Sequence, residues 1–96
     1  MDWKLSKQAE EDFEEIFDQI VESQGIDYAL DFWEEFDKRC DQIGAHPMRW
    51  QVREEYYPGA RKALLRQWAI FFSIQDDVVQ VDHIAHQRSD PARLLH

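Results

Sequence analysis

The chain has 96 residues, 44% of them hydrophobic and 14% aromatic, which suits one globular domain, residues 1–96, with a buried core. A second domain and an intrinsically disordered chain are therefore not expected. The longest apolar run, residues 68–72, falls far short of the roughly 20 residues that span a bilayer, and the acidic first residues do not resemble a signal peptide. These features predict a cytoplasmic protein without a membrane segment.

The net charge of −9 is concentrated in the first half of the chain. Residues 1–48 contain 14 Asp and Glu and 4 Lys and Arg, whereas residues 49–96 contain 6 and 7. Proteins bind polyphosphates mainly through cations that displace condensed counterions, so an acidic chain is disfavoured as a direct partner of nucleic acid. A local cluster of the arginines in the second half could still contact it.

A short strand and a helix are predicted at the start of the sequence. Trp3 and Leu5 lie on one side of the strand, and Ser6 suits the N-cap of the helix that follows. Apolar residues then recur at spacings of three and four until Gly25, which favours the end of a helix. The apolar positions are Ala9, Phe13, Ile16, Phe17, Ile20 and Val21.

A second helix is predicted from an N-cap at Asp27 to a stop at Gly44. Its apolar positions are Ala29, Phe32, Trp33, Phe36, Cys40 and Ile43. Two amphipathic helices joined by two or three residues form an antiparallel hairpin. Cys40 is the only cysteine, so it cannot form an internal disulfide, and its place on the apolar stripe predicts a buried structural thiol.

The second half of the chain has the composition of strands. Turns are indicated at Pro58-Gly59 and at Asp76-Asp77, and the segment before the first of them is expected to be extended or irregular. The predicted strands are residues 61–66, 68–75 and 78–85. The order β-α-α-β-β-β predicts an α+β domain in which the helical hairpin packs on a small, mainly antiparallel sheet.

Several short patterns, taken in this order, resemble the RelE/ParE superfamily of bacterial type II toxin–antitoxin systems. The first helix is similar to that of the family at Ala9 and Asp12, and the second helix at its small residue Ala29. The Pro-Gly-x-Arg pattern is matched by Pro58, Gly59 and Arg61, and the following strand by Trp68, Ile70, Phe72 and Ile74. Near the end, His86, Arg88 and Asp90 resemble a ParE-type ending, with the spacing His-x-Arg-x-Asp in place of His-x-x-Arg-Asp.

The resemblance implies a toxin, and it leaves two mechanisms open. ParE-like members, associated with plasmid stabilisation, inhibit DNA gyrase without evident chemistry of their own, whereas RelE-like members cut mRNA on the ribosome. The ParE-like mechanism is our leading hypothesis, because the chain is acidic and carries the PGAR and HQRSD patterns. A third hypothesis is that the acidic helices imitate nucleic acid, although acidic helix faces are usually just solvated.

A ribonuclease would need proton-transfer groups and cations around the phosphate. The candidates for that role are Arg61, His83, His86 and Arg88. They are weak candidates because the second half contains one lysine, Lys62, and its last residues lack the tyrosine that RelE-like relatives commonly carry there. The sequence therefore assigns no catalytic residue.

Three arginines, Arg61, Arg66 and Arg88, are the predicted target-binding residues. The alternative for Arg61 or Arg66 is a salt bridge to one of the acidic helices. If the three arginines form the target-binding patch, charge removal there should weaken toxicity without unfolding the protein, because surface substitutions usually change stability by less than about 0.5 kcal/mol.

The family resemblance also implies a cognate antitoxin as partner. Large apolar residues on the two helices exceed what a thin sheet covers, so part of this surface is expected to bind an amphipathic segment of a partly disordered antitoxin. The predicted contact residues are Phe13, Phe17, Phe32, Trp33 and Phe36. Acidic helices favour a segment that bears Lys or Arg, and an extended part of it is expected to run along the sheet.

No metal and no cofactor are predicted. His83 and His86 are three residues apart on a predicted strand, so their side chains should point to opposite faces of the sheet. No further cysteine or histidine motif accompanies them. We interpret His86 and Asp90 instead as residues that fasten the end of the last strand by hydrogen bonds.

Overall fold

Two helices and four strands make up the described part of the chain. The computed structural model describes residues 1–88, so the role predicted for Asp90 lies outside the described residues. The elements are β1 (Trp3–Leu5), α1 (Lys7–Gln24), α2 (Ile26–Ala45), a short 3₁₀ helix (Pro47–Arg49), β2 (Arg61–Leu65), β3 (Trp68–Gln75) and β4 (Val78–His86).

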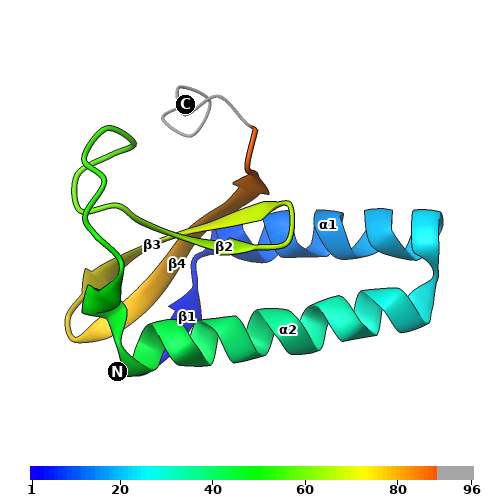
Figure 1. Ribbon diagram of the computed structural model, residues 1–96, viewed down its shortest axis with the longest axis horizontal. Helices are drawn as coiled ribbons and strands as arrows, with labels where there is room; N and C mark the ends of the chain where they lie inside the picture. Colours follow the sequence, from blue (N-terminus) through cyan, green and yellow to red (C-terminus); the bar gives the residue numbers. More distant parts are fainter. Residues whose placement is uncertain (89–96) are drawn as a thin grey trace.

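The four strands form one sheet in the order β1-β4-β3-β2. Strand β3 pairs antiparallel with both β2 and β4, whereas β1 runs parallel to β4. The helices form an antiparallel hairpin against the sheet, and the tip of the hairpin extends beyond it (Figure 1). The predicted β-α-α-β-β-β fold is confirmed. Among residues 1–88, neither helix combines the length and the apolar character needed to cross a bilayer.

The connection between the helices is shorter than predicted. A single residue, Gly25, separates α1 from α2, and its φ of 96° favours glycine. Its N–H donates to the carbonyl oxygens of Ile20 and Val21 at 3.2 and 3.0 Å. Asp27 therefore lies inside the first turn of α2, and the prediction that it caps this helix is wrong.

Gly44 does not end α2, which continues to Ala45. Pro47 ends the helix because a residue before proline is disfavoured in the helical conformation. Gly44 serves a different purpose, since a Cβ at this position would lie 2.6 Å from the carbonyl oxygen of Met1. Only glycine lets the segment that leads into β1 pass this close to the helix.

Two tight turns set the register of β2, β3 and β4. Asp76 and Asp77 join β3 to β4, and both have positive φ, as in the type I′ turns that suit hairpins. This confirms the predicted turn. Arg66 also has a positive φ, 54°, because it belongs to the turn between β2 and β3 and not to the strand, which ends at Leu65.

The main core lies between the hairpin and the sheet. Its fully buried large side chains are Phe32, Phe36, Phe72, Ile43, Ile70, Val79, Val81 and Cys40. Burial, together with the charges of Asp37 and Asp41, raises the pKa of the Cys40 thiol to about 12. A protonated, fully enclosed thiol is not a nucleophile, so the prediction of a structural Cys40 is confirmed.

A second, smaller cluster covers part of the opposite face of the sheet. Tyr56 and Ala60 from the loop before β2 pack there on Ala69 and Phe71 of β3. The ring centroids of Tyr56 and Phe71 lie 4.9 Å apart in an edge-to-face arrangement. The loop over residues 50–60 is thus held against the outer face of the sheet.

The regular pairing of β3 and β4 is interrupted at Asp82. Phe71 pairs with His83 and Phe72 pairs with Val81, so Asp82 has no partner of its own on β3. Such an extra residue is a β-bulge, which re-aims the side chains around it.

The first turns of α1 fasten this bulge. Ser6 Oγ donates to the carbonyl oxygen of Asp82 at 2.9 Å, and the N–H of Ile84 donates to Asp12 Oδ2 at 3.0 Å. Ser6 also accepts a hydrogen bond from the N–H of Ala9, which confirms it as the N-cap of α1. Asp12 therefore satisfies a backbone group of β4 beyond the end of its pairing with β1, which stops at Leu5 and Val81.

Candidate partner-binding surfaces

Three aromatic side chains form an open cluster between the two helices. Phe13 and Phe17 from α1 have their ring centroids 5.9 and 5.8 Å from that of Trp33 on α2, each in an edge-to-face arrangement. Trp33 is 48% exposed, and Phe13 and Phe17 are half-buried. These side chains are packed well enough to be held in place, yet they keep apolar surface for a partner.

Phe32 and Phe36, the other two predicted contact residues, lie elsewhere. Both are buried in the main core, with exposed fractions of 0% and 2%. The expectation that they contribute to an exposed surface is wrong, because the sheet covers them. A periodic stripe in a sequence does not tell which of its members face the sheet and which lie at its border.

Two hollows meet at Trp33. One, of about 400 Å³, is lined by Leu5, Glu10, Phe13, Glu14, Phe17, Asp18 and Trp33. The other, of about 420 Å³, is lined by Leu30, Asp31, Trp33, Glu34 and Asp37. We call the apolar part of this region, which consists of Phe13, Phe17, Leu30 and Trp33, the hairpin surface.

Leu30 is a member that the sequence analysis missed. It is 45% exposed, and Ile26, one turn earlier on α2, is 53% exposed. Residues 26, 30 and 33 follow the spacing of a second apolar stripe, which was the available signal. The stripe is left open because this part of the hairpin extends beyond the sheet (Figure 1).

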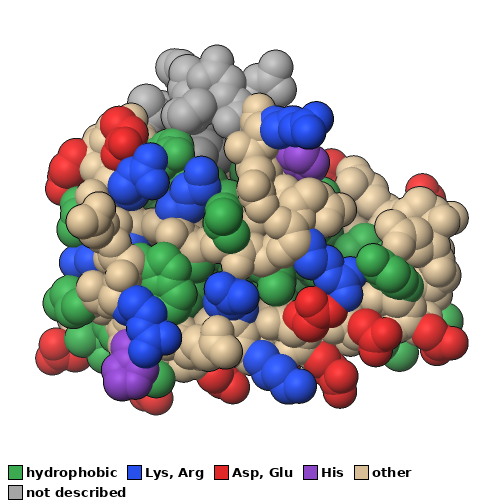
Figure 2. Space-filling model, in the orientation of Figure 1, with side chains coloured by type: hydrophobic (Ala, Val, Ile, Leu, Met, Phe, Trp, Pro, Cys, Tyr) green, Lys and Arg blue, Asp and Glu red, His purple; other side chains and the backbone are tan. Residues whose placement is uncertain are grey.

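The charges around the hairpin surface are negative. All the ionisable residues that line its two hollows are acidic: Glu10, Glu14, Asp18, Asp31, Glu34 and Asp37. In Figure 2, Asp and Glu side chains line the part of this face where α2 begins, whereas Lys and Arg gather on the side of β2 and the loop before it. An apolar strip with an acidic rim suits an amphipathic segment that carries Lys or Arg beside its apolar residues.

Of the predicted target-binding residues, Arg66 is engaged in an ion pair. Its Nε donates to Glu35 Oε1 at 3.2 Å, and its Nη2 pairs with Glu35 Oε2. The guanidinium also lies 4.7 Å from the ring centre of Tyr28. The hydrogen bond from Arg66 to Glu35 raises the pKa of Arg66. The alternative predicted for this residue, a salt bridge to an acidic helix, is thus confirmed.

Arg61 and Arg88 occupy two separate places. Arg61, at the start of β2, donates to the carbonyl oxygen of Trp50 and lies 3.3 Å from Met48 Sδ. Arg88 follows β4, next to the turn that contains Arg66, and is exposed. Because Arg61 and Arg66 stand at opposite ends of β2, the three arginines do not form one continuous patch.

The residues considered for a ribonuclease are not brought into one site, although the Arg88 N–H donates to His86 Nδ1 at 3.1 Å. His83 pairs with Phe71 and contacts Tyr57 on the outer face, with ring centroids 6.0 Å apart. Arg61 pairs with Phe72, whose side chain belongs to the core on the opposite face.

His86 is also separated from His83. It contacts Trp68, which packs against the main core, with ring centroids 5.6 Å apart, so the prediction that the two histidines face opposite sides of the sheet is confirmed. Within residues 1–88, no group of three or more Asp, Glu, His or Cys side chains is arranged to hold a metal ion.

The fold and these surfaces define a two-layer α+β domain that presents an acidic, apolar helical hairpin. A sequence model of the family described as the ParE toxin of the type II toxin-antitoxin system, parDE, matches residues 3–91, nearly the whole chain. The chain therefore belongs to the ParE toxin family, as the sequence patterns indicated.

Individual relatives agree with this assignment. Two proteins, both named Toxin ParE1, from Mycobacterium tuberculosis strains CDC 1551 / Oshkosh and ATCC 25618 / H37Rv, are 29% identical to the chain over 92 residues. The aligned region covers 95% of this chain and 94% of each relative. A solved structure described as the chromosomal ParDE TA system from P. aeruginosa shares the fold, with a TM-score of 0.78 at 20% identity over 90% of this chain and 95% of that one.

Proposed function

We propose that this ParE-type toxin acts by binding and inhibiting DNA gyrase in the cytoplasm, and that a cognate antitoxin neutralises it. The observation that carries the proposal is the match to the ParE toxin family over residues 3–91. The similarity to two proteins named Toxin ParE1 and the shared fold with a ParDE system support it.

The dispersal of the ribonuclease candidates supports a mechanism without chemistry. Arg61 and His83 lie on opposite faces of the sheet, and His86 lies at the far end of β3 and β4. A phosphate in a transition state needs its cations and proton donors within hydrogen-bond distance at the same time. The RelE-like alternative, cleavage of mRNA on the ribosome, lacks this geometry in the described residues.

The antitoxin is proposed to bind the hairpin surface. Phe13, Phe17 and Trp33 offer an apolar strip, and Leu30 extends it toward the tip of the hairpin. The acidic rim would speed the encounter with a basic segment and set its register. A second copy of this chain is a poorer occupant, because its own acidic rim would face the same charges.

The target is proposed to be contacted by the arginines in two groups. Arg61 forms one group at the start of β2, and Arg66 with Arg88 forms the other at the turn between β2 and β3. The guanidinium of Arg66 is less available to the target, because it is bound to Glu35. Charge removal at Arg61 and at Arg88 should therefore be measured separately.

A supercoiling assay tests the gyrase hypothesis. The purified chain is titrated into gyrase with relaxed plasmid, and the same preparation is added to a translation extract with labelled mRNA. Inhibited supercoiling with intact mRNA supports the proposal. Unaffected gyrase together with cut mRNA would establish the ribonuclease alternative instead.

Co-expression tests the antitoxin hypothesis. The chain is expressed with the product of the neighbouring reading frame, and the pair is examined by size-exclusion chromatography with light scattering. A stable complex and rescue of cell growth are expected. A monomeric chain that is harmless and binds no neighbouring product would contradict the toxin–antitoxin assignment itself.

A further inference from the structure

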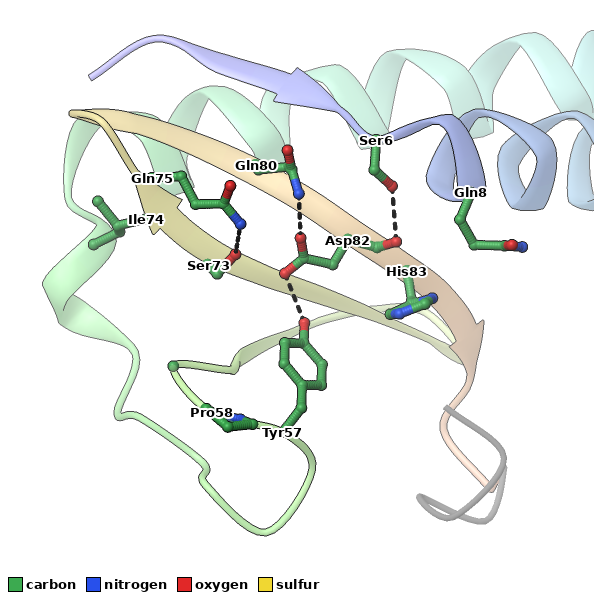
Figure 3. Close-up of a pocket in the computed structure, with 11 residues that line it drawn as sticks. Ser6, Gln8, Tyr57, Pro58, Ser73, Ile74, Gln75, Gln80, Asp82 and His83 are labelled. Carbon is green, nitrogen blue, oxygen red and sulfur yellow. Dashed lines mark hydrogen bonds between the residues drawn. The ribbon is translucent and has the colours of Figure 1, made fainter. Parts of the chain in front are cut away.

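A polar pocket lies on the outer face of the sheet, beside the first turn of α1 and apart from the hairpin surface. It has a volume of about 520 Å³ and is formed by β3, β4, the loop that precedes β2 and the start of α1. Figure 3 shows Asp82 at its centre, between Gln80 on the same strand and Tyr57 from the loop. Of the residues considered above for gyrase binding, antitoxin binding or RNA cleavage, His83 alone lines this pocket.

The β-bulge creates the pocket's arrangement of side chains. On a regular strand Asp82 and His83 would point to opposite faces. With the extra residue at Asp82, both contact Tyr57: Asp82 Oδ2 accepts a hydrogen bond from its hydroxyl at 2.8 Å, and the His83 ring packs against its ring. A carboxylate and two aromatic rings therefore share one wall.

Hydrogen bonds within the pocket direct several of its donors to neighbouring side chains. Tyr57 and the amide nitrogen of Gln80 both donate to Asp82, the latter at 2.7 Å. The amide nitrogen of Gln75 donates to Ser73 Oγ at 3.2 Å, and Ser73 is 8% exposed. The amide oxygens of Gln75 and Gln80 and the remaining lone pairs of the Asp82 carboxylate are left as acceptors.

The pocket is also negatively charged. None of its eleven lining residues is Lys or Arg, and Asp82 is its only carboxylate. Burial and the hydrogen bond to Asp82 raise the pKa of Tyr57, so its hydroxyl remains a donor to the carboxylate at neutral pH. A group that binds here should carry positive charge and several N–H donors, and phosphate is excluded by like charge.

We propose that this pocket binds the guanidinium of an arginine side chain that a protein partner inserts from an extended segment. A planar guanidinium presents five donors, which match one carboxylate and two amide oxygens. It also stacks on aromatic rings, and Tyr57 and His83 supply them. An ammonium group has three donors and no flat face, so lysine fits the same acceptors less well.

The occupant is proposed to belong to a protein because the pocket is open and lies beside the outer face of β3 and β4. A segment that runs along this face would place one side chain in the pocket. The inference does not depend on the gyrase hypothesis, since it concerns the chemistry of the site and not the identity of the target.

Amide chemical shifts of the purified chain test this directly. N-acetyl-arginine amide is titrated into the ¹⁵N-labelled chain, and N-acetyl-lysine amide is titrated in parallel. Saturable shifts at residues 57, 73–75 and 80–83, with at least threefold weaker binding of the lysine compound, are expected. Absence of saturable shifts at these residues, or equal binding of both compounds, would overturn the proposal.

Two variants of matched charge locate the binding. Asp82→Asn should weaken binding of N-acetyl-arginine amide at least tenfold. Asp77→Asn removes one carboxylate from the adjacent turn, outside the pocket, and should change the dissociation constant less than twofold. Equal weakening by both variants would show nonspecific attraction to an acidic protein and overturn the proposal. If Asp82→Asn does not fold, Gln80→Lys replaces it, because an internal ammonium beside Asp82 should block the pocket; undiminished binding in that variant also overturns the proposal.

A peptide arm distinguishes a protein-borne arginine from the free compound. A seven-residue peptide with one central arginine among alanine and serine residues should bind at least as tightly as N-acetyl-arginine amide and shift the same residues. A peptide that fails to shift them while the free compound does would overturn the protein partner as the source.

Discussion

Replacement of Trp33 by alanine should weaken antitoxin binding about 100-fold. Trp33 is 48% exposed. A tryptophan side chain offers up to about 250 Å² for burial, so a partner on the hairpin surface removes about 120 Å² of Trp33 from water. At about 25 cal/mol per Å², this burial contributes about 3 kcal/mol, which corresponds to about two orders of magnitude in the dissociation constant.

The assay is isothermal titration of the antitoxin into each purified toxin variant. Trp33→Ala also removes packing against Phe13 and Phe17, so a melting curve of each variant ensures that folded proteins are compared. Tyr28→Ala is the matched control. Tyr28 is an aromatic residue on the same helix with a similar exposed fraction, 42%, but it packs against Arg66 and lines neither hollow of the hairpin surface.

The control should change the dissociation constant by less than threefold. Equal weakening by Trp33→Ala and Tyr28→Ala, or a change of less than threefold for Trp33→Ala, would show that the antitoxin does not cover the hairpin surface. The reasoning from the aromatic cluster and its acidic rim would then fail, while membership of the family would be unaffected.

Three further predictions concern stability. Phe72→Ala should lower the free energy of unfolding by ~3–5 kcal/mol in urea melts, because Phe72 is fully buried in the core and its loss leaves a cavity; a loss below 1 kcal/mol would contradict this packing. The raised pKa of Cys40 stabilises the fold below pH 9, and this contribution is lost as the pH rises toward 12, at ~1.4 kcal/mol per unit. Urea melts of wild type should therefore lose about 2 kcal/mol more between pH 8 and 10.5 than those of Cys40→Ala, and parallel curves would exclude this effect. Arg66→Ala should lower the free energy of unfolding by about 1 kcal/mol through its partly exposed pair with Glu35, and Glu35→Gln should leave little further loss in the double variant; additive losses would show that the pair is not coupled.

Local patterns in the sequence were sufficient for the elements and their order. Ser6 caps α1 as predicted, because an N-cap acts on a backbone group three residues away. The turn at Asp76 and Asp77 is equally local, since both residues tolerate positive φ. The boundaries that were wrong, at Asp27 and Gly44, depend on how the hairpin meets the rest of the molecule.

The composition of the surfaces was decided by tertiary structure. Phe32 and Trp33 are neighbours in the sequence and were predicted to act together, yet one is fully buried and the other is half exposed. The difference arises because successive residues of a helix point about 100° apart, so Phe32 faces the main core while Trp33 lies at its border. Where that border falls is a property of the packed layers, which no periodicity within a single helix contains.

The sequence by itself determined the family, the two-layer fold and the buried role of Cys40, because these follow from local propensity, apolar periodicity and short motifs. Only the tertiary structure separated Arg66, bound to Glu35, from Arg61, and brought Tyr57 from a loop to Asp82 on β4. Contacts between residues 31 and 25 positions apart depend on register and on a one-residue bulge. A one-residue shift moves a side chain to the other face of a sheet, and the spacing of residues along the chain does not record it.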